Sequence, residues 1–392
     1  MESHLSIDLD KLTELNGSKV DALFKYLKVV SRNKTPVLIK GVKEKDYWNC
    51  NFYECQIPAS HFTDIKIPAL KDNNPEGTET LISLSDKLLT LFTPGTEYIF
   101  KDSKTTVRSG SSRVELANIY SQETLQENLE TYLEVLQSDV SNASTTFIVK
   151  PESKIINVLA EISNSPEGCI FVSDKYLTVL NGSVLFRFDN DCEFKSANNN
   201  LYINMYTANK ILSTLSYCDE VELKLTNTHT VILGYIIKDG AKNLLVKNVS
   251  AIFETDNINI EDEDLKGLIP TNTNQINLKL QDLVTTLTDK ANMIATFSKI
   301  KNLEVGLYKN GNGVSLNVNS GDESHLIINV GDVAEQEPEV NVFTSFVTVL
   351  PLMTMKSLME PEAEIKITYD NEDCSAVSFE SGNVQILSGK LF

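Results

Sequence analysis

Alternating apolar and polar residues dominate the chain and predict a protein rich in β-strands. Two pairs of apolar runs, residues 169–180 with 183–188 and residues 303–308 with 314–318, are each joined by a short segment that contains Asn-Gly. Because asparagine and glycine both tolerate a positive φ, these segments predict β-hairpins. The two-residue alternation typical of a sheet with one buried face recurs in residues 221–225, 231–237, 326–330 and 365–369.

Short helices are predicted between these strands. Residues 18–31 place apolar side chains at helical spacing after Ser18, which is a candidate N-cap. Residues 121–136 predict an additional acidic amphipathic helix that has no counterpart elsewhere in the chain. Further short helices are predicted at residues 85–92, 152–162, 208–215, 281–297 and 344–358, the last interrupted by Pro351.

The order of these elements repeats along the chain. An extended segment, a short helix, a tight turn with glutamate and a strand follow one another around Glu97, Glu220 and Glu364. The helices near residues 18, 152 and 281 open the complementary halves. Since 392 residues exceed one ordinary core, we predict six strand–helix–strands units paired into three α+β domains. The domains span residues 1–142, 143–262 and 263–392, with linkers at residues 138–144 and 257–274.

The distribution of charge matters more than its total. A formal net charge of −19 argues by itself against a nucleic-acid binder, because phosphate contacts need lysine and arginine. Yet residues 17–34 carry five basic side chains against one acidic, and residues 279–301 carry four against two. Residues 152–162, with one lysine against two glutamates, do not share this excess. A basic helical face suits sequence-independent contact with phosphates, and a merely solvated face is the simpler alternative for either helix alone.

The sequence shows no catalytic, metal or cofactor motif. It has no phosphate-binding glycine loop, and the acidic residues 261–264 lack the spacing of a calcium loop. The four histidines, which show no metal-ligand spacing, are His4, His61, His229 and His325. The six cysteines, which form no CxxC pair and are expected to be free thiols, are Cys50, Cys55, Cys169, Cys192, Cys218 and Cys374.

No targeting segment is recognisable either. The first twelve residues lack the basic and apolar regions of a signal peptide, and the longest apolar stretches, such as residues 346–353, are far shorter than a membrane span. We therefore expect a soluble, non-enzymatic protein that stays in the cytoplasm, which is the host's if the protein is viral.

Three segments resemble the bacterial-type DNA sliding clamp, the β subunit that serves as a polymerase processivity factor. Residues 264–270 resemble the segment that joins its second and third domains, and residues 342–352 resemble the strand-into-helix opening of its last half-domain. Residues 171–178 resemble a segment with an acidic residue before a turn and a leucine, with Asp174 near the place of the family's glycine. The first domain departs most, which is typical of a divergent viral or phage member.

The resemblance implies a fold in which helices line a pore and antiparallel sheets form the outer wall. It implies a head-to-tail homodimeric ring, closed by sheet pairing, that encircles double-stranded DNA, tethers a polymerase and is usually placed on DNA by an ATP-driven loader. The implied DNA-facing residues are the basic residues of the helices: Lys19, Lys25, Lys28, Arg32, Lys87, Lys154, Lys210, Lys290, Lys299 and Lys356.

The resemblance also implies a pocket between the second and third domains that binds short apolar peptides of partner proteins. An exposed aliphatic and aromatic cluster suits such a peptide, although Leu177 and Ile386 would equally fill a strand core. The implied pocket residues are Val172, Leu177, Pro270, Ile386, Leu391 and Phe392. Two other readings stay open. A β-rich structural or virion protein explains the hairpins and the acidity, and an enzyme would need titratable groups that converge in a pocket.

Overall fold

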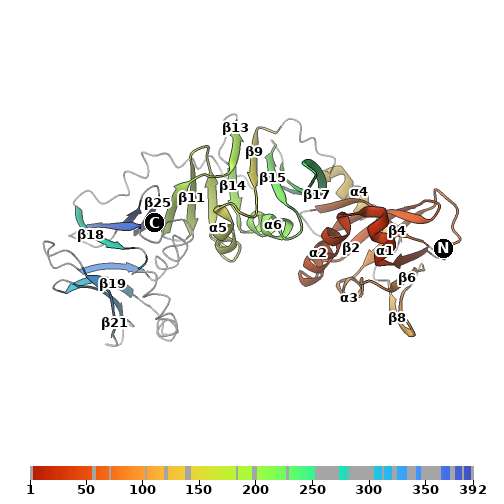
Figure 1. Ribbon diagram of the computed structural model, residues 1–392, viewed down its shortest axis with the longest axis horizontal. Helices are drawn as coiled ribbons and strands as arrows, with labels where there is room; N and C mark the ends of the chain where they lie inside the picture. The colour runs from red at the N-terminus through yellow and green to blue at the C-terminus, as the bar shows by residue number, and fades with distance from the viewer. Residues whose placement is uncertain are drawn as a thin grey trace. The chain divides into compact units, whose positions relative to one another are not determined.

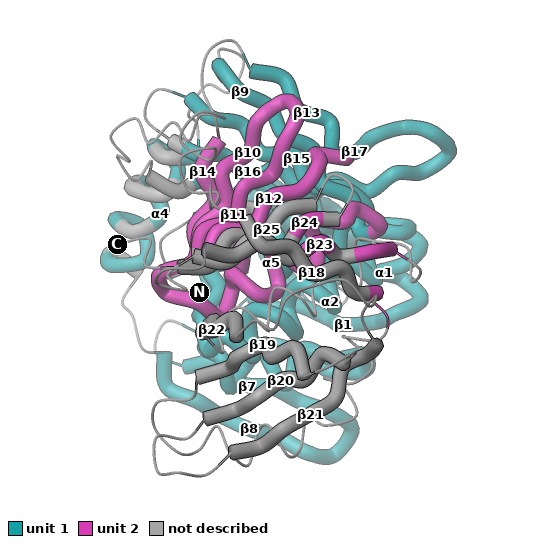
Figure 2. Tube along the Cα trace, turned by 90° about the vertical axis from the view of Figure 1, so that its left-hand side faces the viewer, with its two compact units in different colours: residues 1–151, 192–199, 210–254 teal, residues 152–191, 200–209, 255–392 magenta. Residues whose placement is uncertain are grey.

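A computed structural model gives the architecture of the chain. It describes residues 3–54, 59–69, 72–101, 104–118, 122–136, 143–181, 184–196, 201–226, 229–251, 273–279, 281, 304–310, 313–319, 325–332, 341–345, 363–370, 376–381 and 384–389. The chain forms two compact units, residues 1–151, 192–199 and 210–254 in the first and residues 152–191, 200–209 and 255–392 in the second (Figure 2). The two units are described separately below.

The first unit contains a nine-stranded antiparallel sheet. Its order is β13 (Glu193–Ser196), β9 (Thr145–Val149), β15 (Glu220–Leu225), β16 (His229–Lys238), β17 (Ala241–Ala251), β4 (Ala59–Pro68), β3 (Tyr47–Glu54), β2 (Val37–Lys43) and β5 (Glu79–Leu84). A second sheet has the order β1 (Ser3–Ile7), β6 (Thr96–Phe100), β7 (Lys104–Ser109) and β8 (Ser112–Ala117).

The nine-stranded sheet crosses a predicted domain boundary. Strand β4 belongs to the first predicted domain and β17 to the second, and they pair in register from Val246 opposite Phe62 to Val249 opposite Ala59. We call this β4–β17 pairing the first seam. Because hydrogen bonds of a sheet span the seam, the two sides form one layer.

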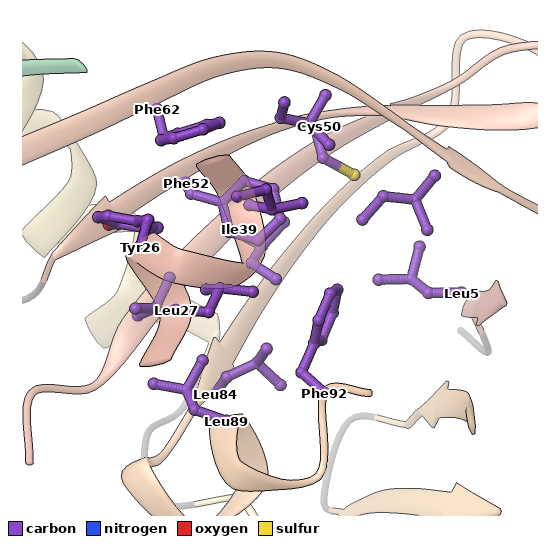
Figure 3. Packing of buried hydrophobic residues seen from close by; sticks show 14 of the residues in the cluster. Leu5, Tyr26, Leu27, Ile39, Cys50, Phe52, Phe62, Leu84, Leu89 and Phe92 are labelled. Atoms are coloured by element: carbon purple, nitrogen blue, oxygen red, sulfur yellow. The ribbon is translucent and has the colours of Figure 1, made fainter. Parts of the chain in front are cut away.

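Three helices cover one face of this sheet, α1 (Leu9–Asn16), α2 (Lys19–Arg32) and α3 (Asp86–Thr90). In Figure 1, α1 and α2 lie beside β2 and β4. Figure 3 shows the core beneath them, where Tyr26 of α2 meets Phe62 of β4 with ring centroids 5.1 Å apart. The Tyr26 ring also meets that of Tyr217 at 5.6 Å, so this core continues across the first seam.

The helix α4 (Gln122–Leu136) covers the opposite face. Leu38 and Tyr53 alternate along their strands with Ile39 and Phe52, which lie in the other core. A strand places successive side chains on opposite faces, so the sheet is buried on both sides. The second core consists of Leu38, Tyr53, Leu125, Leu129, Leu136, Val231, Leu233 and Val249.

The second unit also contains two antiparallel sheets. The larger has the order β14 (Leu201–Asn204), β10 (Cys169–Val172), β11 (Tyr176–Asn181), β12 (Val184–Asp189), β25 (Val384–Gly389), β24 (Ala376–Ser381), β23 (Glu364–Asp370) and β18 (Thr273–Lys279). The smaller has the order β21 (His325–Asp332), β20 (Gly313–Asn319), β19 (Glu304–Asn310) and β22 (Asn341–Ser345). The helix α5 (Ile155–Ile162) belongs to this unit, and the division between the units falls within α6 (Met205–Leu215).

Most local predictions are confirmed where the structure describes them. Both hairpins form, as β11–β12 and β19–β20, and the helices predicted at residues 18–31, 85–92, 121–136, 152–162 and 208–215 appear as α2 to α6. The strand, helix and strand of the repeat appear as β5–α3–β6 and β14–α6–β15. The three-domain division stays a prediction, and the helix at residues 281–297 lies outside the described residues except for Gln281.

Four local predictions were wrong in detail. The run 169–180 is not continuous, because Ser173 turns the chain by accepting a hydrogen bond from the Tyr176 amide through Oγ at 3.0 Å. Residues 273–274 belong to β18 rather than to a linker, because they pair with β23. Residues 344–345 belong to β22 rather than to a helix, because they pair with β19, and the rest of that predicted helix lies outside the described residues. Ser18 precedes α2 in helical geometry, which leaves its side chain without a capping bond among the described residues.

Gly234 of β16 lies where the sheet is closely approached by the end of α6. A Cβ atom at this position would lie 2.6 Å from Thr214 Cγ2 and 2.7 Å from Cys218 Sγ. Gly234→Ala is therefore expected to lower the free energy of unfolding by about 1–3 kcal/mol through overpacking, measured by urea denaturation. Adding Thr214→Ser should restore part of the loss, and an unchanged denaturation midpoint in Gly234→Ala would contradict the close packing.

Candidate nucleic-acid interface

The basic residues of α2 lie on the face of the helix that points away from the core. The buried stripe of the helix is Val20, Ala22, Leu23, Tyr26, Leu27 and Val30. Lys25, Lys28 and Arg32 are exposed at spacings of three and four residues, and Lys19 is half-buried at the first position of the helix. Such spacing puts side chains on one helical face, so the three exposed cations form a stripe.

Lys87 extends this stripe onto α3, which packs against α2. Ser85 caps α3 by accepting a hydrogen bond from the Leu88 amide at 3.4 Å, and Leu88 and Leu89 bury the helix. Lys87 is exposed on the other side. We call Lys25, Lys28, Arg32 and Lys87 the α2–α3 basic face. Delocalised cations of this kind suit phosphates held without base-specific contacts.

Lys210 differs from the other predicted DNA-facing residues. Its Nζ lies 2.5 Å from Glu54 Oε2, and only 21% of the Lys210 side chain and 9% of that of Glu54 are exposed. Glu54 ends β3 and Lys210 lies in α6, so the ion pair connects the two sides of the first seam. Burial raises the pKa of Tyr217, and the negative charge of the nearby Glu54 carboxylate raises it further. The ammonium of Lys210 is thus engaged by a carboxylate, and its predicted contact with DNA stays a prediction.

The remaining predicted cations are placed unevenly. Lys154 is exposed directly before α5, and its backbone amide donates to Asp191 Oδ2 at 3.2 Å. Lys290, Lys299 and Lys356 lie outside the described residues. Of the predicted cations that the structure describes, four of the exposed ones therefore lie on α2 and α3, and the fifth is Lys154.

The predicted peptide-pocket residues are partly brought together. Val172 of β10 lies directly opposite Leu177 of β11, and Ile386 of β25 lies opposite Phe186 in the same eight-stranded sheet. Val172 and Leu177 are fully buried, so the exposure expected of a peptide-binding surface is absent at these two positions. The reason is that both face the core of the sheet. Pro270, Leu391 and Phe392 lie outside the described residues.

The opposite face of the same strands carries a feature that sequence reasoning missed. The Arg187 guanidinium carbon lies 3.6 Å from the centroid of the Tyr176 ring, and Phe171 packs on Tyr202 at 5.4 Å. Arg187 and Tyr176 lie two residue pairs apart along β11 and β12, on one face. The alternation of Arg187 with two phenylalanines in residues 186–188 was the available signal.

A charged cluster lies on the nine-stranded sheet. Lys242 Nζ lies 2.5 Å from Glu220 Oε1, 3.5 Å from Glu222 Oε2 and 4.0 Å from the centroid of the Tyr235 ring. Burial by itself lowers the pKa of Lys242, but the two carboxylates together raise it above its ordinary value. Burial and a hydrogen bond to Glu222 likewise raise the pKa of Tyr235. The two carboxylates therefore favour the charged form of Lys242 on this surface of the sheet.

The described residues also bear on the other kinds of site. Cys50, Cys169 and Cys218 are buried free thiols and Cys192 is half-buried, as predicted, and burial raises the pKa of the first three thiols. No group of three or more acidic, histidine or cysteine side chains that could hold a metal occurs in the described part of the chain. Among the described helices, none combines the length and apolar composition of a bilayer span.

Comparison with known proteins gives matches to solved structures. No family model matches the sequence, and no curated protein sequence matches it. The DNA polymerase III β subunit from Pseudomonas aeruginosa is 11% identical, with 99% of each chain covered and a TM-score of 0.65. The β chain from Streptococcus pneumoniae is 15% identical, with 99% of each chain covered and a TM-score of 0.63.

A third structure shows a related protein with a ligand. The Helicobacter pylori β clamp bound to a DNA ligase peptide is 10% identical, with 99% of each chain covered and a TM-score of 0.62. Full-length similarity at such low identity establishes the architecture, while function depends on the surface. The chain has the α+β sliding-clamp fold with antiparallel sheets.

Proposed function

We propose that the chain is a DNA polymerase processivity factor, a sliding clamp that encircles duplex DNA and performs no chemistry of its own. The observation that carries the proposal is the α2–α3 basic face on a chain of net charge −19 with the sliding-clamp fold. An acidic body repels DNA, whereas a local basic face attracts its phosphates. DNA is therefore favoured at one surface, without a base-specific grip that would prevent sliding.

The free sheet edges support a ring made from two copies. Among the described strands, β8 ends one four-stranded sheet and pairs with β7 alone, and β21 ends the other and pairs with β20 alone, whereas the first seam joins strands into a larger sheet. Five of the six residues of β8 are exposed. Pairing β8 of one copy with β21 of another would join their two four-stranded sheets into one larger sheet, as the β4–β17 pairing does within the chain. This head-to-tail arrangement closes into a homodimer of six domains, if each chain has the proposed domains 1–142, 143–262 and 263–392.

The proposed partners follow from the same assignment. The H. pylori clamp binds a DNA ligase peptide, and we propose that this chain binds short apolar peptides of a polymerase and other partners near β10, β11 and β25. The residues proposed for this pocket remain Val172, Leu177, Pro270, Ile386, Leu391 and Phe392. A clamp loader and an origin in a phage or other virus are parts of this proposal, and the low identity to bacterial clamps favours a divergent member.

The proposal is tested by mass and by topology. Light scattering is expected to give a particle of twice the 43.7 kDa chain mass. The protein should remain on nicked circular DNA during gel filtration and dissociate after the same DNA is linearised, because only a closed ring is held topologically. Equal loss from both DNA forms, with a polymerase and loader present, would overturn the clamp assignment and favour a β-rich structural role.

A further inference from the structure

The helix α4 stands out because it packs on two predicted domains at once. It lies within residues 1–142, yet it contacts β4 and β5 from that part of the chain as well as β17 from the next. Its buried leucines, Leu125, Leu129 and Leu136, share a core with Leu38 and Tyr53 on one side of the first seam. The same core includes Val231, Leu233 and Val249 from the other side.

The end of α4 is fixed on the far side of the seam. Lys247 of β17 donates a hydrogen bond from Nζ to the carbonyl oxygen of Leu136, the last residue of the helix. A cation at a helix C-terminus satisfies a carbonyl that has no partner within the helix and interacts favourably with the helix dipole. Lys247 itself lies opposite His61 in the seam register, so the cap is attached to the seam.

Both faces of the seam are covered by packed side chains. Among the described residues, β4 and β17 pair at four positions, and β16 and β17 pair at ten. On the face opposite α4, the junction is supported by the Tyr26–Phe62 and Tyr26–Tyr217 ring contacts and by the Lys210–Glu54 ion pair. The described strand pairing therefore lies between two packed faces, of which α4 supplies one.

We propose that α4 is a strap that locks the first seam, so that the β4 side and the β17 side of the nine-stranded sheet move as one rigid body. The exposed side of the helix, with Glu127, Glu130 and Glu134, takes no part in this role. The strap is a property of this junction and does not depend on what the chain binds. In a ring, a locked first seam would confine bending to the other junctions.

The test is hydrogen exchange of the full-length chain, followed by mass spectrometry of peptides from each strand. Leu129→Ala empties a fully buried position of α4. It is expected to speed the exchange of the β4 and β17 amides on the order of tenfold or more, with little change in β6 and β7. Glu130→Ala, on the exposed side of the same helix, should leave all of these rates unchanged.

Two further variants separate a strap from an ordinary core helix. Ile99→Ala, at a buried position of β6 that belongs to neither core of the seam, should affect β6 and β7 rather than the seam. Lys247→Met removes the cap and keeps a side chain of similar length, so it should speed seam exchange by a few-fold even if Leu129→Ala fails to fold. If seam amides stay protected while the α4 amides lose protection, the strap is overturned. A uniform acceleration throughout the first unit in Leu129→Ala would also overturn it.

Discussion

Of all the substitutions considered, the largest loss of affinity for duplex DNA is expected when Lys25, Lys28 and Arg32 are all replaced with glutamine. The three cations are exposed on one face of α2, so their removal leaves the core unchanged. Each phosphate contact contributes about 0.9 to the slope of log K against log salt, so the slope should become shallower by about 2 to 3. Affinity at low salt should fall on the order of tenfold to a hundredfold. Fluorescence anisotropy of a labelled duplex over a salt series measures both quantities.

A matched control removes the same charge elsewhere. Lys45, Lys195 and Lys238 are also exposed but belong to neither α2 nor α3, and their joint replacement with glutamine changes the net charge equally. The salt slope of this variant should remain within one unit of the original. If both triple variants lose affinity alike, the α2–α3 basic face is not the DNA-binding surface, and only the overall charge matters.

Lys210→Met is expected to cost the most stability among the charge substitutions. It leaves the Glu54 carboxylate, whose side chain is 9% exposed, without its partner at 2.5 Å. Breaking a buried ion pair from one side costs about 3–5 kcal/mol, and the partial exposure of Lys210 puts the expected loss at about 2–3 kcal/mol. Urea denaturation at neutral pH measures the change in the free energy of unfolding.

The double variant Lys210→Met with Glu54→Gln identifies the cause. Because it removes both charges, it should recover at least half of the loss, and DNA affinity should change little in either variant. A loss of DNA affinity as large as that of the α2 triple variant, with unchanged stability, would instead make Lys210 a direct phosphate contact.

Local patterns predicted the elements that local chemistry determines. The stripe of α2 and the Asn-Gly hairpins need only neighbouring residues, so they were found from the sequence. The helix α1 was missed because it is short, with Leu12 as its one buried residue, and its cap is the Asp8 side chain that accepts from the Lys11 amide. The break at Ser173 was missed because a serine side chain, rather than glycine or proline, makes the turn.

Tertiary contacts explain the rest. Nothing in the sequence pairs β4 with β17, since that register depends on residues far apart in the chain. The same holds for the ion pair of Glu54 with Lys210, which joins residues 156 positions apart. Leu177 shows why the peptide pocket could not be predicted with the same precision. An apolar residue in a strand is expected to be covered, but the sequence does not say whether the core or a partner covers it, and here the core covers Leu177.

In the proposed ring, the edge of β8 that pairs with no other described strand would make the lifetime of the ring depend on the concentration of the chain. The strand is exposed and carries Arg113 and Glu115, with Glu115 also 3.0 Å from Lys104, so the edge stays soluble before it pairs. Closure through such an edge takes two chains and is reversed by dilution. A ring already threaded on DNA keeps its two halves close together after one interface opens, so reclosure no longer depends on the bulk concentration. In a cell that holds few copies of the chain, free rings would therefore dissociate, whereas rings threaded on DNA would persist.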